Sequence, residues 1–272
     1  MVYHSPYLVR IIGWIKKLKR FHLILEVEEI YTDVGNELRL KPEKELAFFS
    51  LADSYLFSTE LLNKKINAQR KPFAVNYGTY QIEPLRDVPA DDGKIHVVYA
   101  GTFDPRKGAE TAVMTGEFLD QNYHVHILGF GSQFEIEKIK SSIAEVSKKT
   151  SATITYDGCL SGEEYVRFIQ RCHIGLSTQN PDAPFNDTSF PSKVLSYLAN
   201  GLRVVSVKIP VLSISKVNDL LYYYDEPTPQ SIAHTIRAID FKTPYLSREQ
   251  LQLLDEEFTN TIAEWIQTSS ND

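Results

Sequence analysis

The sequence predicts an α/β fold made of parallel sheets, with one complete doubly wound domain preceded by a partial second one. Short apolar runs alternate with helical stretches along most of the 272 residues, as in βαβ units. The alternation stops over residues 77–93, which hold two prolines, two glycines and no periodicity, and then it restarts. A hydrophobic content of 43% supplies enough apolar surface for a folded core and excludes a disordered chain.

We expect the first domain over residues 1–85. Residues 7–19 place Tyr7, Leu8, Ile11, Ile12, Ile15 and Leu18 on one helical stripe. Thr59 stands where it can cap a short helix. The predicted strands are 21–27, 54–58 and 72–76, and the other predicted helices are 41–53 and 59–66.

The second domain is expected over residues 86–245, and the residues 246–272 are predicted to form a C-terminal helix that packs back on the N-terminal part. The predicted strands are 95–101, 124–130, 152–158, 173–178, 202–207 and 221–224. Helices are predicted at about 107–121, 133–149, 161–171 and 191–200, which makes the unit a complete doubly wound sheet.

The net charge of −6 is unevenly distributed. Residues 1–20 carry five basic residues and no acidic one, namely Arg10, Lys16, Lys17, Lys19 and Arg20. The acidic remainder argues against nucleic acid as a partner. Two interpretations of the basic segment stay open. It is a crossover helix that packs Ile11, Ile15 and Leu18 on a sheet, or an interfacial helix whose Trp14 and lysines meet an anionic membrane.

Export and metal binding are not expected. No apolar stretch approaches the roughly 18 residues of a membrane span, and no signal peptide is recognisable. Cys159 and Cys172 are expected to be free thiols in a reducing cytoplasm, with peripheral contact at the inner face of the membrane as an option. His124 and His126 share one face of a strand and are interpreted as structural, and Cys172–His173 does not have zinc-ligand spacing. No cofactor is predicted.

Three strand-to-helix junctions could bind a ligand, because parallel sheets place ligands at the carboxyl ends of their strands. The first junction is GTFDPRKG, residues 101–108. Gly101 lets the backbone turn closely, and Arg106 and Lys107 arrive where the next helix begins. This charge arrangement suits a diphosphate, although a single RK pair is more often a solvated loop.

The second junction is LGFGSQFE, residues 128–135, with Gly129 and Gly131. It resembles a dinucleotide fingerprint but lacks the third glycine, so a tight turn beside a nucleotide cleft is favoured over an NAD site. The third is NDTSFPSKVLSYLANG, residues 186–201. Ser189 could cap its helix, and the amides of Ser192 and Lys193 with the Lys193 ammonium form a second candidate anion site. An ordinary capped helix is the alternative.

The order of these motifs resembles the nucleotide-sugar-binding domain of GT-B glycosyltransferases. YAGTFDPRKG, HILGFGS, ITYDGCLSGEEYVRFIQRCHIGLST and SFPSKVLSYLANGLRVVS follow one another as in retaining family four, in its polysaccharide-building branch. The likeness covers residues 95 to about 240 well, with a Rossmann-like donor domain. Over residues 21–80 it is looser, and there it covers the end of the acceptor domain.

The resemblance implies transfer of a sugar, with retention and without a metal, from a nucleotide-diphosphate sugar to a glycan or lipid-linked acceptor in capsule or exopolysaccharide assembly. It implies a diphosphate site that includes Gly101, Thr102, Arg106, Lys107, Ser192 and Lys193. The nucleoside and sugar are then expected near Gly129, Gly131, Gly158, Leu160, Asp187, Thr188, Ser189, Phe190 and Ser196. No catalytic residue can be assigned.

The sequence also departs from the family. Thr102 stands where many relatives have a basic residue, and Thr188 and Ser196 stand where many have two glutamates; Asp187 could partly replace the first. The opening part of the acceptor domain is not recognisable, so the chain looks like about two thirds of a full enzyme. The alternative is therefore a non-catalytic donor-binding module, or a subunit that needs self-association or a second chain.

Overall fold

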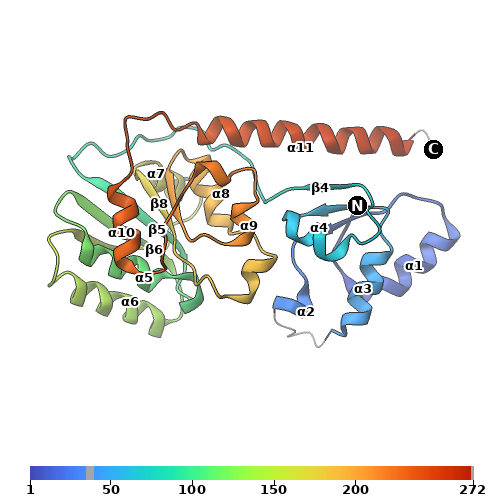
Figure 1. The fold of residues 1–272 in the computed structure, drawn as a ribbon, viewed down its shortest axis with the longest axis horizontal. Helices are drawn as coiled ribbons and strands as arrows, with labels where there is room; N and C mark the ends of the chain where they lie inside the picture. The colour runs from blue at the N-terminus through green and yellow to red at the C-terminus, as the bar shows by residue number, and fades with distance from the viewer. Residues whose placement is uncertain (35–39, 271–272) are drawn as a thin grey trace.

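The computed structural model describes residues 1–34 and 40–270, and it shows two α/β domains that are each built on one parallel sheet (Figure 1). The strand order is β1-β2-β3-β4 in the N-terminal domain and β10-β9-β8-β5-β6-β7 in the second domain. Every strand pair formed by the described residues is parallel. The predicted fold class is confirmed.

The N-terminal sheet is covered by short helices that enclose a small core. Leu25, Val27, Phe57 and Leu62 are fully or almost fully buried there, and Phe48 packs over them from a helix. Thr59 caps its helix by accepting a hydrogen bond from the amide of Leu62. The strands are β1 (Val2–Tyr3), β2 (Ile24–Val27), β3 (Ser54–Phe57) and β4 (Phe73–Val75). The helices are η1 (Pro6–Leu8), α1 (Val9–Leu18), α2 (Tyr31–Val34), α3 (Pro42–Ser50) and α4 (Glu60–Ile66).

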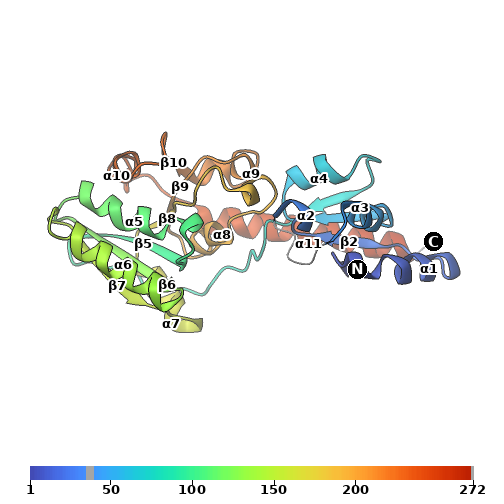
Figure 2. The ribbon, with the colours of Figure 1, turned by 90° about the horizontal axis from the view of Figure 1, so that it is seen from below.

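The second domain contains the larger core. Its central strands read as apolar runs because helices cover both faces of the sheet, as Figure 2 shows. The strands are β5 (Ile95–Thr102), β6 (Tyr123–Phe130), β7 (Thr153–Gly158), β8 (Ile174–Ser177), β9 (Arg203–Ser206) and β10 (Leu221–Tyr223). The α-helices are α5 (Ala109–Thr115), α6 (Gln133–Val146), α7 (Gly162–Gln170), α8 (Ser192–Ala199), α9 (Pro210–Ser213) and α10 (Pro229–Arg237). Short 3-10 turns are η2 (Pro105–Lys107), η3 (Gly116–Phe118), η4 (Pro184–Asp187) and η5 (Asn218–Leu220).

Strand order positions the ligand crevice of this domain. From β5 the chain proceeds to β6 and β7 on one side, and then crosses to β8 and β9 on the other. The crevice therefore lies outside the carboxyl ends of β5 and β8, where connections leave the sheet in opposite directions. The loops that begin at Phe103 and Thr178 meet there.

Two predicted helix boundaries are wrong. The helix expected at 107–121 is shorter, because Gly108 adopts a left-handed conformation (φ +84°) and ends η2 before α5 begins. Ser189 does not cap α8. Its amide donates to the carbonyl of Phe185 and so closes the preceding turn, while Pro191 stands at the N-cap position without a side-chain hydrogen bond.

The basic N-terminal helix is mostly exposed, which contradicts its interpretation as a packed crossover helix. Only Ile12 on α1 is buried, whereas Ile11, Trp14 and Leu18 remain 56%, 65% and 63% exposed. Ile15 is also exposed, at 38%. The apolar stripe predicted from the spacing therefore exists, but apart from Ile12 its residues on α1 face outward.

The two domains are joined twice. Residues 76–94 connect the sheets without forming a helix or strand, and helix α11 (Ser247–Ser270) runs from the second domain along the N-terminal one (Figure 1). The helix contacts both α8 and β4, and Lys216 pairs with Glu257 at 2.5 Å. Tyr77 in the connecting segment stacks on Phe190 and accepts a hydrogen bond from the amide of Lys216.

Among the described residues, no helix is both long enough and apolar enough to cross a bilayer. Cys159 is exposed, Cys172 is buried, and both are free thiols.

Candidate functional site

A cleft of about 450 Å³ opens at the carboxyl ends of β5 and β6, beside the start of α8. The three junctions selected from the sequence all contribute to it. The predicted residues that line the cleft are Gly101, Thr102, Lys107, Gly129, Leu160, Ser192, Lys193 and Ser196. Segments separated by almost a hundred residues therefore meet at the expected edge of the sheet.

Glycines allow the close backbone approaches that form the cleft wall. A Cβ atom on Gly129 (φ +150°) would lie 1.8 Å from the carbonyl oxygen of Gly101. A Cβ atom on Gly108 (φ +84°) would lie 1.9 Å from the carbonyl oxygen of Thr178. Neither position can accept a side chain without movement of the neighbouring backbone.

Lys193 places a buried ammonium group in the cleft. Its Nζ lies 3.7 Å from the centroid of the Tyr99 ring and has no hydrogen-bond partner among the described residues. Burial, together with the nearby Lys107 charge, lowers the pKa of Lys193 to about 7. A desolvated cation of this kind gains strongly from an anionic ligand.

Lys107 supplies a second cation on the same side. Its Nζ lies 4.0 Å from the centroid of the Phe185 ring, and burial lowers its pKa. No carboxylate of the described residues forms an ion pair with Lys107 or Lys193. The charge of Lys107 lowers the pKa of Lys193, so an anion between the two ammonium groups would relieve their repulsion.

Helix α8 adds backbone donors. Ser192 and Lys193 are its first residues, and no side chain caps their end of the helix. Both residues line the cleft, so the positive end of the helix dipole lies beside it. Two ammonium groups and a helix N-terminus together form a site that suits a diphosphate.

Arg106 does not join this site, contrary to the prediction. Its guanidinium forms a bidentate contact with the Asp104 carboxylate, with Nη2 to Oδ2 at 2.6 Å. Asp104 also accepts from the Arg106 amide, and these contacts lower the pKa of Asp104 to about 2. The side chain is thus held as part of the η2 turn.

Several other predicted residues lie outside the cleft lining. Gly131 precedes the capping box of Ser132 and Glu135 that begins α6. Gly158 adopts φ +81° with open space beside it. Phe190 stacks on Tyr77 between the domains, and Ser189 belongs to the turn after η4. Thr188 is buried with an unpaired hydroxyl, and the side chain of Asp187 lies outside the part of the chain that the structure describes.

Residues that the sequence did not reveal complete the wall. Tyr165 comes from the middle of α7, and its hydroxyl hydrogen-bonds Ser196 at 3.1 Å. Gln179 donates from Nε2 to Asn186 at 2.5 Å, which fixes its amide beside the cleft. Neither residue belongs to a local motif, so only the three-dimensional arrangement identifies them.

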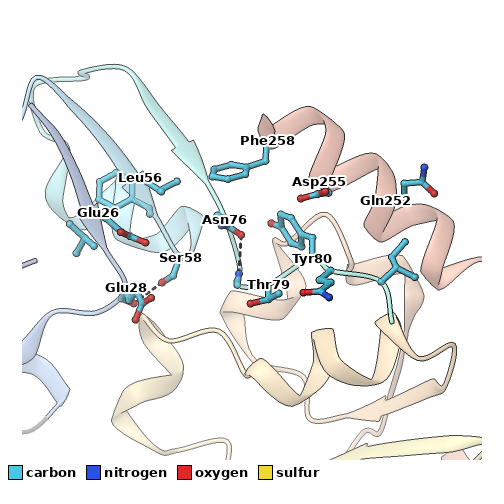
Figure 3. Close-up of a pocket in the computed structure, with 15 residues that line it drawn as sticks. Glu26, Glu28, Leu56, Ser58, Asn76, Thr79, Tyr80, Gln252, Asp255 and Phe258 are labelled. Carbon is cyan, nitrogen blue, oxygen red and sulfur yellow. Dashed lines mark hydrogen bonds between the residues drawn. The ribbon is translucent and has the colours of Figure 1, made fainter. Parts of the chain in front are cut away.

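A larger pocket of about 760 Å³ lies at the ends of the N-terminal strands, against α11 (Figure 3). Asp255 and Phe258 reach from α11 toward the strand ends that carry Ser58 and Asn76. Ser58 donates to the carbonyl of Glu28, and Asn76 accepts from the amide of Gly78. Its polar lining consists of carboxylates, amides and hydroxyls from Glu26, Glu28, Ser58, Asn76, Thr79, Gln81, Gln252 and Asp255.

A third cavity borders both hollows. A cavity of about 260 Å³ shares Gly78, Thr79 and Gln81 with the large pocket. The same cavity shares Tyr165, Ser192 and Ser196 with the cleft. The pocket at the ends of the N-terminal sheet and the cationic cleft of the second domain thus border the same intermediate cavity.

An acidic side chain of the N-terminal domain also approaches Lys107. Glu29, in the loop between β2 and α2, lies near enough to Lys107 to raise its pKa against the larger effect of burial. Helix α2 contacts η4, the turn that carries the Phe185 ring beneath Lys107. The carboxyl ends of the two sheets therefore face each other across the site.

This arrangement, in which two α/β domains face each other across a cleft, is a GT-B fold. No family model and no curated protein matches the sequence, but solved structures share its fold. Anabaena Alr3699/HepE in complex with UDP superposes with a TM-score of 0.69 at 13% identity, over 98% of this chain and 78% of that one.

Two further solved structures have a similar fold. The lipopolysaccharide outer core galactosyltransferase WaaB has a TM-score of 0.62 at 17% identity, over 95% of this chain and 79% of that chain. The UDP-forming α,α-trehalose-phosphate synthase from Burkholderia vietnamiensis has a TM-score of 0.63 at 12% identity, over 100% and 72%. At sequence identities of 12–17%, the structural similarity establishes the fold alone.

Proposed function

We propose that the protein is a glycosyltransferase that moves a sugar from a nucleotide-diphosphate sugar to a glycan or lipid-linked acceptor. The observation that carries this proposal is the pair of ammonium groups, Lys107 and Lys193, at the uncapped N-terminus of α8. A diphosphate is both the group this site suits and the leaving group of such a transfer. HepE has been solved with UDP and with UDP-glucose, which makes UDP the first probe.

Leaving-group stabilisation follows from the same residues. As the glycosidic bond to the diphosphate breaks, negative charge grows on the departing oxygen, and prearranged cations and amides stabilise that charge. Lys193 and Lys107 would supply the positive charge that a divalent metal supplies elsewhere. We therefore propose metal-independent transfer, and retention of the anomeric configuration remains part of the same proposal.

The pocket of the N-terminal domain is the proposed acceptor side. Carboxylates and amides accept hydrogen bonds from sugar hydroxyls, and Tyr80 and Phe258 add apolar ring surface. This lining suits a glycan better than an apolar molecule. A polysaccharide or exopolysaccharide precursor is the acceptor class that we propose.

Helix α1 is the proposed site of membrane contact. Trp14, Ile11 and Leu18 are exposed beside Arg10 and Lys17, and residues 1–20 carry no acidic group. An exposed apolar stripe flanked by cations matches an anionic bilayer surface. Such contact would bring a lipid-linked acceptor toward the site.

The test is a transfer assay with the full chain, a panel of labelled nucleotide sugars and membranes that carry lipid-linked glycans. The proposal predicts labelled product with wild type and none with Lys193→Met. Binding of a nucleotide sugar without any transfer, in every donor and acceptor combination, would overturn it and favour the donor-binding module. Addition of candidate partner chains to that assay separates an isolated module from a split enzyme.

A further inference from the structure

Three histidines gather on one face of the second sheet, apart from the donor cleft. His96 lies on β5, and His124 and His126 lie at alternate positions on β6. In the parallel register His96 pairs with His124, so all three imidazoles project from the same face. Buried parallel strands normally fill such positions with aliphatic side chains. The presence of three imidazoles on this face of the sheet therefore requires an explanation.

Their nitrogens are close enough to share one ion. One ring nitrogen from each histidine lies within 4.8 Å of the others. His96 Nδ1 and His126 Nε2 are 2.8 Å apart, and the rings of His124 and His126 stack with centroids 3.8 Å apart. His96 and His126 are buried, while His124 is partly exposed.

The hydrogen-bond contacts of His96 and His126 require one more proton than two neutral imidazoles carry. His96 Nε2 contacts Asp92 at 3.0 Å, and His126 Nδ1 contacts Asp157 at 3.2 Å. Together with the contact between the two rings, these groups form a series of three hydrogen-bond contacts. Each contact needs one proton or cation between two atoms that both carry lone pairs. Two neutral imidazoles supply only two N–H groups. A third positive centre between His96 Nδ1 and His126 Nε2, a proton or a metal ion, completes this series.

The outer contacts match those of metal-ligating histidines. Such residues usually donate their second ring N–H to a carboxylate, which fixes the tautomer and the ring orientation. Asp92 and Asp157 stand in that role for His96 and His126. Thr155 donates to Asp157 at 2.9 Å and can therefore accept from His124 Nε2 at 3.0 Å. That leaves Nδ1 of His124 with a lone pair.

We propose that His96, His124 and His126 bind one Zn²⁺ ion, with Asp92, Asp157 and Thr155 holding the imidazoles in place. Three imidazoles are an established zinc ligand set, and zinc is the commonest ion that prefers them. Zn–N bonds of about 2.0–2.1 Å place tetrahedral ligand nitrogens about 3.3 Å apart. His96 Nδ1 and His126 Nε2, now 2.8 Å apart, must therefore separate by about half an ångström. The ligand nitrogen of His124, which lies within 4.8 Å of the other two, must move closer to them.

A proton could satisfy only the link between His96 and His126, because a proton joins two nitrogens. A metal ion can also engage His124, whose ring stacks on His126 and whose nitrogen lies within 4.8 Å of the other two. The proposed zinc site is separate from the proposed site of sugar transfer, since none of the three histidines lines the donor cleft.

The test uses the full chain, stripped of metal with a chelator and then titrated with Zn²⁺ alone at pH 7.5. We expect one equivalent to bind, with a rise in the melting temperature that the chelator reverses. Co²⁺ in the same site should give the visible bands of a tetrahedral ion. His124→Gln and His126→Gln should each weaken binding about 100-fold or more. His234→Gln, at an exposed position on α10, is the matched control and should bind like wild type.

The outcomes separate this proposal from the proposed function. Circular dichroism and a cooperative melting transition verify that each variant is folded, whether or not UDP binds. Absence of a zinc-dependent shift in the stripped wild type would overturn the metal site, and that measurement needs no variant. Equal zinc affinity in His124→Gln and wild type would also contradict the three-histidine site. Neither result bears on nucleotide binding.

Discussion

Lys193 illustrates how one residue can be costly for the fold and useful for the site. Burial holds its pKa at about 7, so the folded protein resists protonation that the unfolded chain would accept. Between that pKa and the ordinary value near 10.5, the unfolded state binds more protons, and stability should rise with pH. An anion in the cleft reverses the balance by favouring the ammonium form.

This reversal predicts a pH dependence of binding. Above pH 7 Lys193 in the free protein is increasingly deprotonated, and it must take up a proton again when the diphosphate binds. The dissociation constant for UDP should therefore rise roughly tenfold between pH 7 and 8.5, a range above the phosphate pKa of about 6. Calorimetry at several pH values measures this slope. Lys193→Arg stays charged and should show a nearly flat profile; the same slope in that variant would assign the titration to another group.

Lys107 should contribute to the same contact without the same pH signature. Charge-assisted contacts to phosphate are worth about 1.5–3 kcal/mol, so Lys107→Ala should weaken UDP binding about tenfold or more. Arg106→Ala is the neighbouring control, because Arg106 pairs with Asp104 instead of lining the cleft. If Arg106→Ala is the more damaging change, the phosphates lie on the outer side of η2.

The elements show what sequence patterns can and cannot reveal. Apolar runs identified the strands of the second domain, and strand order then brought the three junctions together. Strand β1 was missed because two residues carry no periodicity. Tyr165 and Gln179 were missed because cleft residues in a helix middle or an irregular loop have no local signature. The pocket beside α11 depends on a helix about 200 residues away in the chain.

Two glycines distinguish close packing from simple backbone strain. Gly108 and Gly158 both adopt φ near +80°, but only at Gly108 would a Cβ meet a backbone atom, at 1.9 Å. Gly158→Ala should cost about 1–2 kcal/mol of unfolding free energy, whereas Gly108→Ala should cost more and also weaken UDP binding. Chemical denaturation and calorimetry measure the two effects. Equal losses of stability would contradict the close contact with Thr178.

Helix α1 provides the test of membrane contact. Trp14→Glu should reduce binding to vesicles that contain anionic lipid, because it places a charge in the exposed apolar stripe. Lys17→Glu should reduce it through charge, and high salt should weaken wild-type binding. Lys148→Glu, an exposed change on the opposite domain, is the matched control in a flotation assay. Wild type that remains unbound at low salt would contradict the proposed contact.

At the scale of the molecule, two half-sites depend on the domain arrangement. The donor cleft belongs to the second domain, and the polar pocket belongs to the N-terminal strands and α11. The intermediate cavity, the Tyr77 stack on Phe190 and the contact between α2 and η4 keep them adjacent. The sequence indicated two domains, but the adjacency of the hollows depends on how the domains are placed. The proposed transfer needs both hollows, whereas the proposed nucleotide binding needs only the cleft.

The most direct test of the account is a calorimetric titration of UDP into wild type and Lys193→Met at pH 7. The account predicts that wild type binds one UDP and that the variant binds at least 30-fold more weakly. The variant should also melt at a higher temperature, because the buried ammonium is gone. Lys148→Met, at an exposed position in the turn after α6, should bind UDP like wild type. Equal affinity in wild type and a stably folded Lys193→Met would contradict the proposed diphosphate site and the transfer built on it.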